Sequence, residues 1–157
     1  MISQPSELTS LSSALESAIV DLEQIAKQST PHPSRFHARD ILIPLGSLLA
    51  ADLPFPVEAI TDRLKKLTAP FAENWERALA EEMQLATAEY VTSVDPRYLE
   101  MDGYDFNYTT AARERLEARL LACECLGHTN PELLGKQIEK ADETYRPFRE
   151  RYEAEQA

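Results

Sequence analysis

Apolar residues recur at alternating steps of three and four along both ends of the sequence, and this spacing constrains the fold more than any other feature. Such steps place side chains on one side of a helix, whereas a half-buried strand needs alternation at every second residue. The spacing predicts helices from Ser6 to about Lys27 and from Glu132 to about Tyr152. Their stripes are Leu8, Leu11, Leu15, Ala18, Leu22 and Ile25, and Leu134, Ile138, Ala141, Tyr145, Phe148 and Tyr152.

The centre of the chain predicts further helices. One should run from about Arg39 to Asp52 with Pro44 in its first turns, and another should open at Thr109 or Thr110 and stop at Gly127. Residues 57–93 form either one bent helix or two, because Pro70 lacks a backbone donor. Only four glycines are available for hairpin turns, which argues against a many-stranded sheet. We therefore expect one all-α domain over residues 1–157, an antiparallel helical bundle of five to six helices with loops at 28–38 and 94–108.

The formal net charge of −11 limits the choice of partners. An acidic surface repels phosphate backbones, so nucleic-acid binding is not expected, and solubility is the simplest interpretation. A more specific interpretation is a basic protein partner, or mimicry of nucleic acid towards a protein that binds it. The most apolar stretch, 41–51, is too short for a membrane span, and residues 1–30 do not resemble a secretory signal. With Cys123 and Cys125 too close for an ordinary disulfide, we expect a cytoplasmic protein.

The loop at 94–108 combines aromatic and acidic side chains. Rigid aromatic rings with polar neighbours are typical of protein-recognition surfaces, because they bury a large area with little loss of rotamer freedom. The alternative is a loop whose aromatic rings close the end of the bundle. No register gives the oxygen ligands of an EF-hand. The predicted partner-binding residues are Tyr98, Glu100, Asp102, Tyr104, Asp105, Phe106 and Tyr108.

A small basic island lies in the loop at 28–38 and just beyond it. It could hold an anion or another polar ligand, or it could simply be solvated. The residues are His32, Arg35, His37 and Arg39. No metal site is expected at Cys123, Cys125 and His128, because Cys-x-Cys within a helix directs the two sulfurs apart.

Two pairs of carboxylates with i, i+3 spacing suggest an alternative. Glu73 and Glu76, and Glu139 and Asp142, are each spaced to share a helix face, which is similar to the magnesium-binding pairs of all-α nucleotide pyrophosphohydrolases. Glutamate is so frequent in this chain that such pairs are expected by chance. The sequence contains no phosphate-binding loop, nucleophile elbow or zinc-protease motif.

These patterns favour a non-catalytic helical protein-interaction module, an adaptor, regulator or inhibitor without a cofactor. We expect a protein partner, neither nucleic acid nor a membrane, and allow for a homodimer through the terminal helices. A metal-dependent all-α hydrolase with helix-borne carboxylates is the alternative. A third possibility is a small-ligand sensor with a pocket near Trp75 and Tyr90.

Overall fold

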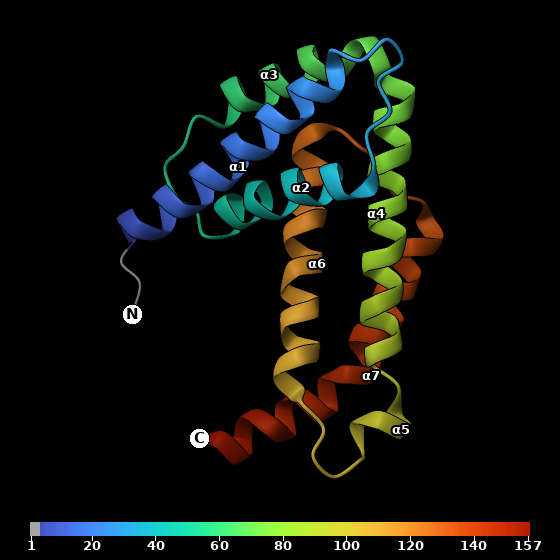
Figure 1. Cartoon of the computed structure of the whole chain (residues 1–157). Coiled ribbons are helices and arrows are strands. Elements are labelled where there is room, and N and C mark those ends of the chain that lie inside the picture. The colour runs from blue at the N-terminus through green and yellow to red at the C-terminus, as the bar shows by residue number, and fades with distance from the viewer. Residues whose placement is uncertain (1–3) are drawn as a thin grey trace. The chain divides into compact units, whose positions relative to one another are not determined.

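The protein is all-α, as predicted from the sequence. The structure, a computed structural model, describes residues 4–157, among which no strand occurs; residues 1–3 of the predicted domain lie outside this range. The elements shown in Figure 1 are α1 Gln4–Ala26, α2 Arg35–Ala50, α3 Val57–Thr68, the 3₁₀ turn η1 Ala69–Phe71, α4 Ala72–Ser93, α5 Pro96–Leu99, α6 Phe106–Leu126 and α7 Glu132–Gln156.

Two compact units make up this part of the chain. Unit 1 comprises residues 4–82 and 117–129, and unit 2 comprises residues 83–116 and 130–157. The divisions fall inside α4 and α6, so each of these helices contributes one part to each unit.

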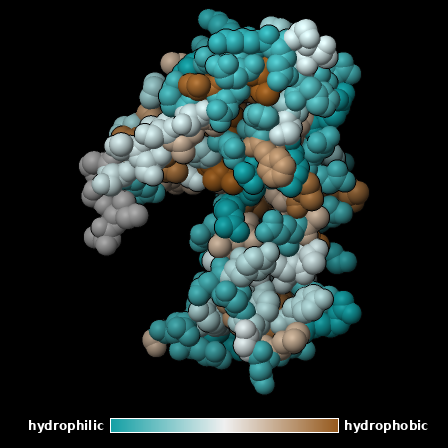
Figure 2. Space-filling model, in the orientation of Figure 1, coloured by the Kyte–Doolittle hydropathy of each residue, from teal (hydrophilic) through white to brown (hydrophobic). Residues whose placement is uncertain are grey.

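The core of unit 1 forms between α1 and its neighbours α2 and α3. The predicted stripe of α1 is confirmed at its centre, where Leu15, Ala18 and Leu22 are buried together with Ile19. Its outer members, Leu8, Leu11 and Ile25, are half-buried. Its opposite face carries exposed serines, which give α1 its pale surface in Figure 2. Because the apolar stripe is buried within unit 1, it does not support a dimer seam along α1.

α2 begins earlier than predicted, and the predicted loop at 28–38 is correspondingly shorter. The backbone N–H of Ser34 donates to Nδ1 of His37 at 3.1 Å, and the Ser34 hydroxyl lies 3.0 Å from the same nitrogen. His37 thus serves an otherwise unpaired N–H at the helix start, a role more often filled by Glu or Gln. Pro44 therefore lies well inside α2, buried, and not in its first turns.

The prolines and glycines near the other helix ends act largely as predicted. Residues 57–93 form two helices, α3 and α4, separated by η1 with Pro70 at its centre. α6 ends at Gly127, whose φ of 77° permits a Schellman turn in which His128 N–H donates to the carbonyl of Cys123 at 2.9 Å. α7 continues through Pro147 as one helix.

The prediction of a non-helical loop at 94–108 is wrong in part. Residues 96–99 form the single turn α5, and α6 begins at Phe106 and not at Thr109 or Thr110. The irregular residues of this stretch are therefore 94–95 and 100–105. In the described residues, no helix has the length and apolar character required to cross a membrane.

Gly46 allows α2 to approach α6 within unit 1. A Cβ atom built on Gly46 would overlap the backbone carbonyl group of Ala118. Backbone atoms cannot yield as a flexible side chain can, so a larger residue must push the helices apart.

Gly46→Ala is expected to lower the free energy of unfolding by about 3 kcal/mol, because the added methyl group overpacks this contact. Gly135→Ala provides the matched control, since no atom lies within 4 Å of a Cβ at this exposed position in α7. That change should raise stability by about 0.5–1 kcal/mol through better helix propensity. Urea denaturation followed by circular dichroism measures both, and equal stability of the two variants would contradict the close contact.

Candidate functional site

The acidic–aromatic segment, residues 95–108, is held in shape by two of its own acids. The Asp95 carboxylate accepts hydrogen bonds from the backbone N–H of Arg97 at 2.9 Å and from its guanidinium at 2.7 Å. Asp105 Oδ1 accepts a hydrogen bond from the backbone N–H of Asn107 at 3.0 Å. Each acid satisfies a helix-terminal N–H that has no partner within its own helix. Asp105, one of the predicted binding residues, therefore caps α6.

Tyr104 is turned into unit 2. Its hydroxyl donates to the carbonyl oxygen of Ser93 at 3.0 Å and is also hydrogen-bonded to the buried hydroxyl of Thr109. Burial raises the pKa of Tyr104 to about 12, so the phenol remains a proton donor at neutral pH. These contacts anchor the bend to the end of α4 and the start of α6.

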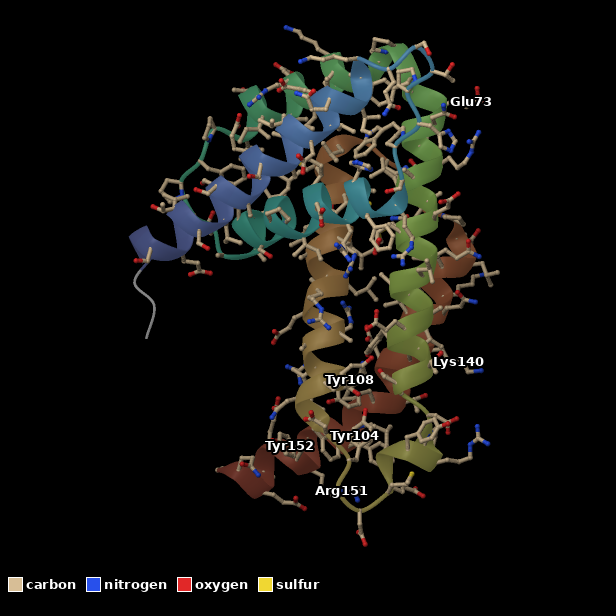
Figure 3. The ribbon with its side chains drawn as sticks, in the orientation of Figure 1. Glu73, Tyr104, Tyr108, Lys140, Arg151 and Tyr152 are labelled. Atoms are coloured by element: carbon tan, nitrogen blue, oxygen red, sulfur yellow. The ribbon has the colours of Figure 1, made fainter. Side chains whose placement is uncertain are left out.

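Phe106 is the centre of an aromatic cluster that includes Tyr104 and two rings of α7. Tyr104 meets it edge-on at 4.9 Å between ring centroids, and Tyr152 stacks on it at 4.8 Å with an interplanar angle of 14°. Tyr145 lies 6.5 Å away and donates a hydrogen bond to the Phe106 carbonyl at 3.3 Å. Figure 3 shows Tyr104 and Tyr152 gathered at this end of unit 2. Tyr104 and Phe106 thus close one end of a helical unit, the alternative considered for the segment.

Other side chains of the segment remain exposed. The fractional exposure is 49% for Tyr98 and 50% for Tyr108, and Glu100, Asp102 and Asp105 are exposed as well. Tyr108 donates its hydroxyl to Glu89 at 3.2 Å, which fixes the direction of the ring. Met101 is 59% exposed as well, and as neither an aromatic nor an acidic residue it is not indicated by the composition of the segment. The outward surface, defined as Tyr98, Glu100, Met101, Asp102, Asp105 and Tyr108, is therefore both apolar and acidic.

Asp142 joins three helices in unit 2. Its carboxylate accepts hydrogen bonds from the Tyr90 hydroxyl of α4 at 2.6 Å, and from the Arg113 guanidinium of α6 at 2.8 and 3.0 Å. Tyr90 is only 1% exposed. No sequence pattern indicates this network, because its members are distant along the chain.

The network also sets the protonation of its members. Partial burial alone would raise the pKa of Asp142, but the hydrogen bonds from Arg113 and Tyr90 and the positive charges of Arg113 and Arg146 outweigh burial and lower it. Burial, followed by the hydrogen bond to Asp142, raises the pKa of Tyr90 well above its usual value. At neutral pH the network therefore consists of a carboxylate, a guanidinium and a neutral phenol.

One member of each predicted carboxylate pair already has a protein partner. Asp142 is neutralised by Arg113, and Glu76 is hydrogen-bonded to His128 within unit 1. A cation at Asp142 would have to displace the guanidinium. Across the described chain, no group of three or more His, Cys, Asp or Glu side chains is arranged to hold a metal ion.

Arg35 and Arg39, near the start of α2, both lie over the ring of Phe36, at 4.1 and 5.0 Å from its centroid, and both are paired with acids. Arg35 pairs with the buried carboxylate of Glu82 at 3.4 Å, and Arg119 approaches that carboxylate at 3.3 Å. Arg39 pairs with its neighbour Asp40 at 3.1 Å, while His37 caps the helix and His32 is exposed. Each guanidinium thus has an intramolecular carboxylate, which leaves little free charge for an anion.

The remaining residues singled out from the sequence belong to the helical core or lie beside it. Trp75 is 5% exposed and Cys123 1% exposed, and both contribute to unit 1. Cys125 is half-buried, with its sulfur 3.4 Å from the hydroxyl of Thr61. Neither ring proposed for a ligand pocket, Trp75 or Tyr90, is open to solvent.

Comparisons of the chain with protein-family models, with curated proteins and with solved structures gave no match. The assignment of function therefore rests on the residues themselves.

Asp142→Asn is expected to lower the free energy of unfolding by about 1–2 kcal/mol at pH 7, because Arg113 loses its charged partner. The pKa of Asp142 is lower in the folded than in the unfolded chain, so its contribution is present above about pH 4 and disappears as the pH falls further. The difference between parent and variant should therefore shrink below about pH 4. Urea denaturation across pH 3–8 tests this, with Asp102→Asn as the exposed control; a gap independent of pH would contradict it.

Proposed function

We propose that the chain is a non-catalytic helical protein-interaction module that binds its partner through the outward surface of the acidic–aromatic segment. The observation that carries this proposal is the exposure of Tyr98, Met101 and Tyr108, each about half or more accessible within eleven residues of sequence. Large apolar side chains contribute strongly to binding when a partner covers them. Single exposed apolar residues are common, whereas three so close together are a reason to expect a partner.

The acidic residues among them favour a basic partner. Glu100, Asp102 and Asp105 are exposed beside these rings, and the whole chain carries a formal charge of −11. Opposite charge on a partner accelerates encounter and selects against acidic competitors. A segment of a partner protein with Lys or Arg next to an apolar residue has the matching chemistry. Nucleic acid does not, because its phosphates would be repelled.

The inward half of the segment prepares the outward half for binding. Asp95 caps α5, and Tyr104 anchors the bend between α5 and α6. A surface held in place before binding loses less conformational entropy when a partner docks. The residues that are not available for contact therefore still support recognition.

Two further parts of the proposal concern the cellular compartment and the oligomeric state. Cys123 and Cys125 lie too close along one helix for an ordinary disulfide, which fits a reducing compartment such as the cytoplasm. A homodimer remains compatible with the module, although the stripe of α1 is buried within unit 1. The metal-dependent hydrolase is less well supported, because Asp142 is already paired with Arg113.

The outward surface can be tested by changing Tyr98, Met101 and Tyr108 to Ala together. Partners captured from a native lysate by the parent chain should be depleted at least tenfold with this variant, since two or three anchor residues typically dominate an interface. Leu133→Ala is the matched control, because Leu133 is 65% exposed but lies in α7. Quantitative mass spectrometry compares the captures. Identical partner sets for the parent and the triple variant would remove the proposed role of the surface.

A further inference from the structure

The last part of α7 differs from the rest of that helix. All of the buried residues of α7, Leu134, Ile138, Ala141 and Tyr145, precede Pro147. We define residues 148–156 as the C-terminal arm; within it Phe148 and Tyr152 are half-buried and the other side chains are exposed. The arm is therefore not part of the core of unit 2.

Pro147 weakens the helix where the arm begins. Proline has no backbone N–H, so the carbonyl of Glu143 cannot receive its usual helical hydrogen bond from position 147. A helix as short as the arm is also marginal in water without packing. The arm needs a contact with unit 2 to remain ordered.

One such contact is an aromatic stack. Tyr152 stacks on Phe106 at 4.8 Å between centroids, with the planes only 14° apart. Within the arm, Arg149 pairs with Glu153 at 3.0 Å and Arg151 lies 5.3 Å over Phe148. By contrast, Tyr145 ahead of Pro147 is tied to Thr110 at 3.0 Å and to the Phe106 carbonyl. Firm attachment of α7 therefore ends before the proline.

We propose that the C-terminal arm is a latch on the acidic–aromatic segment, which opens at Pro147 and exposes the face of Phe106. This inference rests on the proposed function, because the exposed ring enlarges the same binding surface. The partner places an aromatic or long aliphatic side chain on Phe106 where Tyr152 lay, next to its basic residues facing Glu100 and Asp102. The closed arm thus lowers affinity for the partner, and the partner holds the arm open.

The opening itself can be measured without any partner. Arg149 and Arg151 are exposed trypsin sites within the arm. Tyr152→Ala removes the stack and should accelerate cleavage at these sites by about two- to tenfold, the range expected for loss of one aromatic pair when cleavage follows the open population. Leu133→Ala, which shortens an exposed side chain at the opposite end of α7, should leave the rate unchanged. An unchanged rate for Tyr152→Ala would overturn the latch.

A second measurement tests regulation. With the partner identified by the capture experiment, full-length Tyr152→Ala should bind it about two- to tenfold more tightly than the parent. Circular dichroism confirms that unit 2 remains folded. Phe106→Leu should abolish the gain in affinity, because it removes the flat ring on which the partner's side chain stacks. Faster cleavage with unchanged or weaker affinity would overturn the regulatory role. The two proposals can fail separately. If the triple surface variant keeps all partners while Tyr152→Ala still accelerates cleavage, the proposed function fails but the opening of the arm stands.

Discussion

The side chain of Asp142 is the constraint on which unit 2 depends. Its carboxylate receives hydrogen bonds from α4 and α6, so one residue of α7 fixes the positions of three helices. Such a pair adds little net stability over well-packed apolar residues, but loss of one member leaves a charge without its partner. Its value is that it specifies one arrangement of helices. The acidic–aromatic segment and the C-terminal arm both depend on that arrangement for their position.

The helices could be predicted from the sequence where an apolar stripe and a terminator coincide, as in α1 and at Gly127. Helix starts were harder, because they depend on which side chain receives the first backbone N–H groups. His37 takes this role in α2, and Asp105 takes it within a run of aromatic residues that resembles a loop. The Asp142 network was beyond prediction, since i, i+3 spacing does not show which residues another helix brings close.

The candidate site was predictable only as a stretch of chain. Composition identified residues 95–108 but could not distinguish the aromatic rings that pack inside unit 2 from those that are exposed to solvent. Tyr104 and Tyr108 have the same side chain, yet Tyr104 is hydrogen-bonded inside unit 2 and Tyr108 is half exposed. The difference arises from the packing of Phe106 against α7, a contact between distant parts of the sequence. The buried residues of the segment thus hold its exposed residues in a defined arrangement.

The contact of Gly46 with Ala118 also has a consequence for biosynthesis. Unit 1 is discontinuous, since its second piece, residues 117–129, follows the first part of unit 2 in the chain. The N-terminal helices can form as they leave the ribosome, but their packing is incomplete until Ala118 has been translated. Until then the face of α2 around Gly46 is uncovered. A nascent chain of this protein therefore has a period in which its first three helices are exposed to chaperones.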